Sequence, residues 1–165
     1  MRSKISRMDR DPAACRERIG LVGCVKSKRN HPTQAQDLYT SPLFSGRRRW
    51  VEQTCDRWFI LSAKYGLVAP GQVVQPYDET LANKSRSARH AWAQSVITDL
   101  QSQLRDLVAY SFEVHAGAAY CDFGLRDGLV RAGAAVETPT CHLTLGKQLA
   151  LYRDGPPPNG AVPQK

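Results

Sequence analysis

The sequence predicts one α/β domain of three layers, with helices on both faces of a central, mainly parallel sheet of four or five strands. Short continuous apolar runs recur along the chain, as expected for strands covered on both faces. Segments with apolar residues at three-and-four spacing lie between those runs, and this alternation is typical of a parallel sheet. A chain of 165 residues with 42% hydrophobic content can also bury a core without disulfide or metal support.

The elements are expected in a regular order. Apolar and β-branched runs predict strands at 19–25 (IGLVGCV), 58–62 (WFILS), 111–115 (SFEVH) and 134–138 (AAVET). Helices are predicted at 41–54, 87–108, 120–132 and 145–152. The longest, 87–108, carries an apolar stripe of Trp92, Val96, Ile97, Leu100, Leu104, Leu107 and Val108. Pro42 suits the start of the first helix, and Gly133 suits the end of the third.

The domain is expected to span residues 18–153. Residues 1–17 are predicted to be a disordered basic tail, and residues 154–165 a flexible Pro-rich tail. No apolar run has the length of a signal peptide or of a membrane helix, so a cytoplasmic location is expected. The five cysteines show no CxxC spacing, which predicts reduced thiols and no metal site. No redox-cofactor fingerprint is present, and no cofactor is predicted.

The formal net charge of +8 indicates an acidic partner. A basic surface attracts phosphate-bearing small molecules or nucleic acid, and no membrane partner is expected. The oligomeric state is left open by the sequence.

Unusual side chains follow each predicted strand. Ligands of open α/β sheets bind beyond the carboxyl ends of the strands, so these side chains are expected to share one crevice. They are Cys24, Lys26 and Lys28 after the first strand, Ser62, Lys64, Tyr65 and Gly66 and then Tyr77 and Asp78 after the second, His115, Gly117 and Tyr120 after the third, and Gly146 and Lys147 after the fourth.

Several of these residues suit a phosphate-bearing ligand. Lys26 and Lys28 can hold a phosphate as point charges, although GxxxxGK[ST] is absent. Lys64 can present an ammonium group to the crevice, and Tyr65 can present a phenol. Gly66 permits the positive φ of a tight turn. The alternative for the lysine loop is a solvated surface.

Other residues leave two readings open. Asp78 can act as a general base or stabilise an oxocarbenium-like cation, and it can equally cap the next helix. Cys24 lies beside two lysines that would lower a thiol pKa, but no partner base is evident and a buried core thiol is the favoured reading. His115 is either a ligand contact or a satisfied structural residue.

The third and fourth loops offer further contacts. Gly117 lets a ligand approach the backbone, and Tyr120 can stack on a base. Gly146 and Lys147 begin the last helix, where free N–H groups either bind an anion or are simply capped.

In order along the chain, the motifs LVGCVKSK, DLYTSPLF, ILSAKYGLV, PYDETL, HAGAAY and LGKQLALY resemble a bacterial family classed as a domain of unknown function. The resemblance covers about residues 19–152. The family is also distantly similar to YaaA-type peroxide-stress proteins and to an accessory domain of archaeosine synthase. The resemblance implies a link to nucleic acids or modified bases, and it adds Tyr39 and Ser41, together with Asp37, Leu38 and Phe44, to the pattern.

The leading prediction is an enzyme that processes a nucleotide, nucleoside or nucleic-acid base, by cleaving or exchanging an N-glycosidic bond. Asp78, Lys64 and Cys24 are the predicted catalytic residues, and the other crevice residues are predicted to bind the ligand. One alternative is a non-catalytic nucleic-acid-binding module that uses Arg47, Arg48 and Arg49 with the lysine loop. Another is a thiol enzyme dependent on Cys24.

Overall fold

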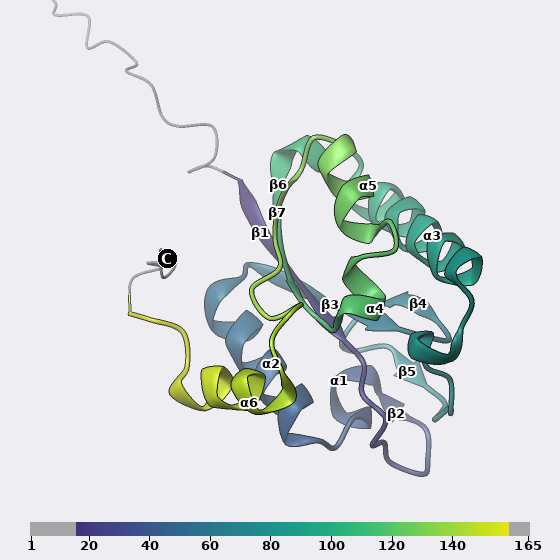
Figure 1. Ribbon diagram of the computed structural model, residues 1–165, viewed down its shortest axis with the longest axis vertical. Coiled ribbons are helices and arrows are strands. Elements are labelled where there is room, and N and C mark those ends of the chain that lie inside the picture. Colours follow the sequence, from purple (N-terminus) through teal and green to yellow (C-terminus); the bar gives the residue numbers. More distant parts are fainter. Residues whose placement is uncertain (1–15, 159–165) are drawn as a thin grey trace, which may run out of the picture.

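The computed structural model describes residues 16–158, in which a five-stranded sheet lies between two layers of helices (Figure 1). Its strands are β1 (Glu17–Gly23), β3 (Arg57–Ser62), β4 (Gly66–Val68), β6 (Tyr110–His115) and β7 (Ala135–Glu137), with a separate pair formed by β2 (Thr33–Gln34) and β5 (Val73–Val74). Most of the predicted N-terminal and C-terminal tails lie outside the described residues.

The helices are α1 (Ala35–Leu38), α2 (Pro42–Thr54), α3 (Arg86–Leu104), α4 (Ala118–Cys121), α5 (Leu125–Arg131) and α6 (Leu145–Asp154). Figure 1 shows α2 and α6 on one face of the sheet and α3 and α5 on the other. The predicted three-layer α/β/α architecture is therefore confirmed. No helix within residues 16–158 combines the length and apolar content needed to cross a bilayer.

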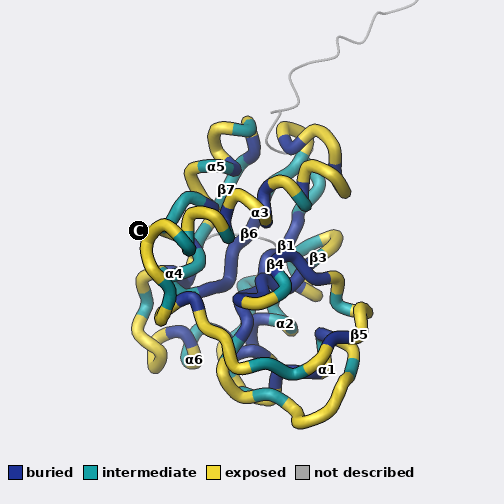
Figure 2. The backbone as a smooth tube through the Cα atoms, turned by 90° about the vertical axis from the view of Figure 1, so that its right-hand side faces the viewer, coloured by how far each residue is buried: buried dark blue, intermediate teal, exposed yellow. Residues whose placement is uncertain are grey.

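The sheet has the order β4-β3-β1-β6-β7. β1 pairs in parallel with β3 and β6, and β6 pairs in parallel with β7, whereas β4 runs antiparallel to β3 at the edge. In β1, Ile19 to Gly23 are all buried, because helices cover both faces of this central strand (Figure 2). The carboxyl ends of β1, β3, β6 and β7 therefore meet at one edge of the sheet.

Three local features differ from the prediction. The predicted helix 87–108 ends at Leu104, because Arg105 adopts a φ of 65° and Asp106 caps a separate turn by accepting a hydrogen bond from the Val108 N–H. The predicted helix 120–132 is split into α4 and α5, because Gly124 has a φ of 110°. Residues 66–68, expected in a loop, form β4.

Close contact between α2 and α6 depends on Gly46. A Cβ at this position would lie 2.6 Å from the Tyr152 Cβ. The Tyr152 Cβ is fixed to the α6 backbone, so a methyl group at position 46 would push the two helices apart. The sequence pattern shows only a glycine inside a predicted helix and no reason for it.

Substitution of Gly46 by alanine is expected to lower the free energy of unfolding by about 1–3 kcal/mol, because overpacking of a tight contact outweighs the roughly 1 kcal/mol by which alanine favours a helix. The free energy would be measured by urea denaturation. Gly146 is the control, since it lies in α6 with no atom within 4 Å of a built Cβ. Its replacement by alanine should leave stability unchanged or raise it, and a stabilising Gly46→Ala would contradict the packing argument.

Candidate functional site

The loop after β1 is held by backbone hydrogen bonds. The Cys24 N–H donates to the Leu61 carbonyl at 3.0 Å, which extends the β1–β3 ladder by one residue. Lys28 and Tyr39 then form an isolated antiparallel bridge. These bonds bring the lysine loop and the Tyr39 segment over the carboxyl ends of β1 and β3.

Ser62 organises the turn after β3. Its buried Oγ accepts hydrogen bonds from the backbone N–H groups of Lys64 and Tyr65, at 3.3 and 3.0 Å. Gly66 follows with a φ of 71°, so the positive φ predicted for this glycine is confirmed. The turn leads directly into β4 and exposes the Lys64 side chain.

Tyr77 is the centre of the polar contacts. Its hydroxyl lies 2.7 Å from the Tyr39 hydroxyl and accepts a hydrogen bond from Ser62 Oγ at 2.8 Å. The Tyr65 ring meets the Tyr77 ring edge-on, with centroids 5.5 Å apart. Residues 24, 39, 62, 65 and 77 thus converge from segments that are far apart in the sequence.

Lys28 is the cation of this site. Its Nζ lies 4.4 Å from the centroid of the Tyr77 ring and 5.7 Å from that of Tyr39, and it donates to the Lys26 carbonyl. Burial lowers the pKa of Lys28, and this is opposed by the nearby Cys24 and Asp78. The Lys28 ammonium is therefore partly desolvated, which strengthens its attraction for an anion.

Cys24 connects the residues around Tyr77 to Tyr120 of α4. Its Sγ lies 3.0 Å from the Tyr120 hydroxyl. The Tyr120 ring packs edge-on against Trp92 of α3, with centroids 5.4 Å apart, and the Trp92 Nε1 donates to the Ser62 carbonyl at 2.8 Å. We call the residues Cys24, Lys28, Tyr39, Ser62, Tyr77 and Tyr120 the Cys24 cluster.

The tyrosines of the Cys24 cluster are neutral at physiological pH. Burial raises the pKa of Tyr39, Tyr77 and Tyr120, and the neighbouring Cys24 raises each of them further. Each phenol therefore serves as a neutral hydrogen-bond donor and acceptor. Neutral hydroxyls beside one ammonium group suit a ligand that carries sugar hydroxyls or base edges together with a phosphate.

Asp78, Lys64 and Lys26 lie at the rim. All three are exposed, and the Lys64 Nζ lies 5.3 Å from the centroid of the Tyr65 ring. Asp78 follows Tyr77 directly and attracts the Lys28 ammonium. Asp78 does not cap the turn at Leu81–Asn83, because the cap is Thr80, which accepts from the Ala82 N–H at 3.3 Å.

The structure places His115 in a different polar group. His115 is fully buried, with Nε2 2.6 Å from Glu113 Oε1 and Nδ1 2.7 Å from the Tyr152 hydroxyl. The Trp50 Nε1 also donates to Glu113 Oε1 at 2.5 Å, and Arg18 forms an ion pair with Glu113 Oε2. Both ring nitrogens of His115 therefore have protein partners, which fits the structural reading of this residue.

Four further predicted residues stand outside the Cys24 cluster. Ser41 caps α2 by accepting from the Phe44 N–H at 3.2 Å. Gly117 precedes α4, and a Cβ built there meets no atom within 4 Å. Gly146 and Lys147 are exposed in the first turn of α6, where Thr144 accepts from the Lys147 N–H at 3.4 Å. Within residues 16–158, Gly117 is joined to the cluster only through its backbone, where its carbonyl accepts from the Tyr120 N–H at 3.0 Å.

The three consecutive arginines of α2 do not form one basic surface. Arg47 is buried, and its Nη1 donates to the Gly23 carbonyl at 3.0 Å. Arg48 pairs with Asp37 at 3.0 Å and with Glu52 at 2.8 Å. The expectation that all three track a phosphate backbone is therefore wrong, because α2 turns Arg47 toward the core.

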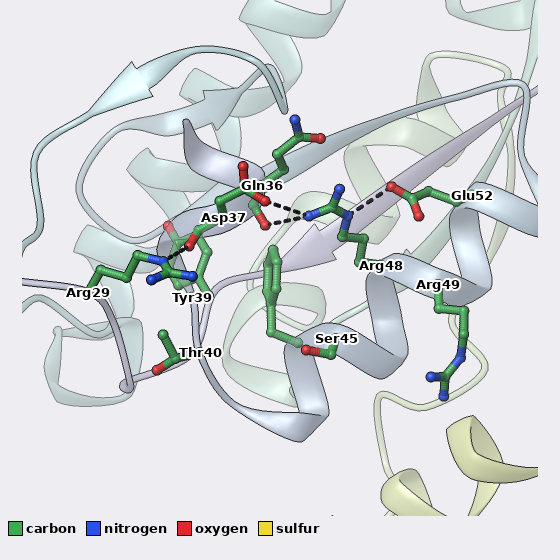
Figure 3. A pocket seen from close by; sticks show the side chains of 10 residues that line it. Arg29, Gln36, Asp37, Tyr39, Thr40, Ser45, Arg48, Arg49 and Glu52 are labelled. Atoms are coloured by element: carbon green, nitrogen blue, oxygen red, sulfur yellow. Dashed lines mark hydrogen bonds and ion pairs between the residues drawn. The ribbon is translucent and has the colours of Figure 1, made fainter. Parts of the chain in front are cut away.

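A surface hollow of about 580 Å³ lies beside the Cys24 cluster (Figure 3). Tyr39 contributes to it, and Arg29, Arg48 and Arg49 line it together with Asp37 and Glu52. Figure 3 shows Arg48 held between the two carboxylates, while the Arg49 guanidinium points away from both. The hollow therefore carries a small excess of positive charge next to Tyr39.

Sequence patterns missed some contacts of the site. Trp92 was expected only on the apolar face of a helix, yet its indole supports both Ser62 and Tyr120. The bond between Tyr39 and Tyr77 joins residues 38 positions apart. The only hint in the sequence was the indole N–H of Trp92, a polar group on an otherwise apolar helix face. The sequence does not identify its hydrogen-bond partner.

Comparisons with known proteins place the chain among proteins without an assigned activity. Residues 19–154 match a family described as "Family of unknown function (DUF6884)". Uncharacterized protein YfjM of Bacillus subtilis (strain 168) is 34% identical over 71 residues. That alignment covers 39% of this chain and 47% of YfjM, so the chain spans about half the length of this relative. No solved structure matches.

Proposed function

The chain belongs to DUF6884, a family of unknown function, and we propose that it is an enzyme that cleaves or exchanges the N-glycosidic bond of a nucleotide, nucleoside or nucleic-acid base. The observation that carries this proposal is the Cys24 cluster. In the cluster, the neutral phenols Tyr39 and Tyr77 lie beside a partly desolvated Lys28 at the carboxyl edge of the sheet. This edge is where ligands of open α/β sheets bind.

Each part of a nucleotide has a suitable partner. Lys28 and the exposed Lys26 and Lys64 attract the phosphate. The half-buried rings of Tyr65, Tyr77 and Tyr120 are the candidate stacking surface for a base, and tyrosine hydroxyls match sugar or base polar groups. The net charge of +8 favours the approach of such anions.

Asp78 supplies the carboxylate for the chemistry. In N-glycosidic cleavage the bond from C1′ to the base nitrogen breaks, the base leaves with the electron pair, and a cation develops on the sugar. A carboxylate next to the ligand stabilises that cation or removes a proton from the attacking water. Asp78 stands at the rim beside Lys28, where it can act on a sugar whose phosphate is held by the lysines.

The resemblance of the motifs to YaaA-type proteins and to an accessory domain of archaeosine synthase supports the same ligand class. Those proteins suggest a link to nucleic acids or modified bases. The resemblance does not distinguish a free nucleotide from a base within a nucleic acid, so the experiment must do so.

A thermal-shift screen at two salt concentrations tests the proposal. Nucleotides, nucleosides, free bases and short oligonucleotides are the probes. A ligand that binds only the native state raises the melting temperature, by an amount equivalent to about 2.7 kcal/mol at a hundredfold excess over Kd. We expect one class of small nucleotide or nucleoside to give a salt-tolerant shift, and base release from it by the wild type.

Asp78→Asn should keep the thermal shift and lose most of the base release, by on the order of 100-fold or more, because general acid–base groups contribute about 10²–10⁴-fold. Asp127→Asn is the matched control, as Asp127 is an exposed carboxylate of α5. Equal turnover in Asp78→Asn and Asp127→Asn would overturn the proposed role of Asp78. Shifts with oligonucleotides alone, vanishing at high salt, would favour a non-catalytic nucleic-acid-binding module instead.

The contact between Cys24 and Tyr120 favours a second candidate, a Cys24-dependent thiol enzyme. Cys24 lies at the strand end with Tyr120 at 3.0 Å and Lys28 nearby. If the thiol is the nucleophile, Cys24→Ser should abolish turnover while Cys55→Ser retains it. Unchanged turnover in Cys24→Ser would remove this candidate and leave the Asp78 mechanism standing.

A further inference from the structure

Two adjacent pairs of residues, Cys121–Asp122 and Cys141–His142, meet beyond the carboxyl ends of β6 and β7. Asp122 ends α4, where its N–H donates to the Ala118 carbonyl at 2.9 Å. Cys141 and His142 lie in the loop between β7 and α6. The side chains of Asp122, Cys141 and His142 thus offer one oxygen, one sulfur and one nitrogen in the same place.

The three ligand atoms are already close together. They all lie within 4.8 Å of one another. Asp122 Oδ1 is 3.7 Å from Cys141 Sγ and 3.8 Å from His142 Nε2. Zinc binds these atom types at about 2.0–2.3 Å in a tetrahedron, which sets neighbouring ligand atoms roughly 3.3–3.7 Å apart. Small side-chain movements would therefore complete the coordination.

The backbone that carries the ligands is well supported. The Thr140 Oγ1 accepts from the Tyr152 hydroxyl at 3.2 Å, and the Leu143 carbonyl accepts from Gln148 Nε2 at 2.9 Å. Residues on both sides of Cys141 and His142 are therefore tied to α6. Ligands held in this way lose little freedom when a metal binds.

Solvent access and the Asp122 carboxylate suit a metal ion. Cys141 is 4% exposed, whereas the His142 side chain is 73% exposed, so one side of the group opens to solvent. Within residues 16–158, the Asp122 carboxylate makes its polar side-chain contacts with Cys141 and His142.

We propose that Asp122, Cys141 and His142 form a site for one zinc-type divalent transition-metal ion. An oxygen, a thiolate and an imidazole are a donor set that selects such metals over Mg²⁺ or Ca²⁺. Three protein ligands leave the fourth position of the tetrahedron to water. The ion joins α4, whose Tyr120 contacts Cys24, to the loop before α6.

Metal titration of the full, reduced chain tests the site. After chelator treatment, Zn²⁺ is added in competition with a chromophoric chelator, and we expect one tightly bound ion per chain. Co²⁺ in place of Zn²⁺ should give the sulfur-to-metal charge-transfer band of a thiolate ligand. Cys141→Ala and His142→Ala should each weaken binding by more than about 100-fold, since loss of an outer partner alone costs about 10–100-fold.

Matched controls separate ligation from general effects. Cys55→Ala and His31→Ala remove a cysteine and a histidine elsewhere in the chain and should bind zinc like the wild type. His142 is largely exposed, so its replacement should leave the fold intact. Wild-type affinity in either Cys141→Ala or His142→Ala, or the absence of stoichiometric binding by the wild type, would overturn the site. Neither result bears on the Asp78 mechanism.

Discussion

Replacement of Glu113 by alanine is expected to lower the free energy of unfolding by about 3–5 kcal/mol, as found when one partner of a buried charged pair is removed. Glu113 is 5% exposed and bonds His115, Trp50 and Arg18. Its loss leaves the Nε2 of the buried His115 imidazole and the Trp50 indole N–H without partners, each costing about 1–3 kcal/mol. Urea denaturation followed by circular dichroism measures the change.

Glu137 provides the control for Glu113. It lies directly across from Glu113 in the β6–β7 pair, but it is exposed. Glu137→Ala should change stability by less than about 0.5 kcal/mol. Comparable losses in the two variants would mean that strand pairing, and not the buried polar contacts, explains the effect.

Glu113 also gives stability a pH dependence. Burial raises its pKa, but hydrogen bonds and charge attraction from His115 and Arg18 outweigh burial and hold the pKa below the ordinary 4.5. A carboxyl with a lowered folded-state pKa stabilises the fold above the unfolded-state value. The wild type should therefore lose this contribution as the pH falls below about 4.5, and Glu113→Gln should lack that part of the acid sensitivity.

Trp92→Ala is expected to cost about 3 kcal/mol, the lower end of the range of about 3–5 kcal/mol for removing a large aromatic side chain from a core, because Trp92 is half-buried. Trp92 packs against both hydrophobic clusters of the protein, one on each side of the sheet. It also donates to the Ser62 carbonyl and supports the Tyr120 ring. The Trp92→Ala variant should therefore have a lower free energy of unfolding. It should also show a smaller ligand-induced rise in melting temperature, because Trp92 supports the Cys24 cluster.

Trp92→Phe separates these contributions. Phenylalanine keeps an aromatic ring against Tyr120 but cannot donate to Ser62, so a loss of about 1–2 kcal/mol is expected. Trp58 is the comparison site, because it is half-buried at the opposite end of β3. If Trp92→Ala costs no more than Trp58→Ala and spares ligand binding, Trp92 does not support the site.

The strands and main helices were predictable because their signals are local. Continuous apolar runs at 19–25 and 111–115 mark strands buried on both faces, and the structure places β1 and β6 there with ends shifted by one or two residues. The helix boundaries were less predictable. Arg105 and Gly124 end or split helices through positive φ angles, which an apolar pattern does not encode.

The candidate site was predictable in position and only partly in composition. Parallel strands bring their carboxyl ends to one edge, so residues after β1 and β3 were expected to meet, and Cys24, Lys28, Ser62 and Tyr77 do meet. His115 ends β6, but its ring nitrogens bond Glu113 and Tyr152 on the side of α2 and α6, so the side chain is used in that buried contact and not in the Cys24 cluster. The proposed metal ligands had no recognisable spacing, because Asp122 lies 19 positions before the Cys141–His142 pair and meets it only in three dimensions.

The sequence by itself determined the fold class, the order of the main elements and the edge of the sheet where polar loops gather, since these follow from apolar periodicity and chain connectivity. Only the tertiary structure decided which polar side chains are buried and which partners they have. Arg47, Glu113 and His115 resemble surface or site residues along the chain, yet all three are buried. Burial and partner depend on contacts between segments remote in sequence, and no local pattern carries that information.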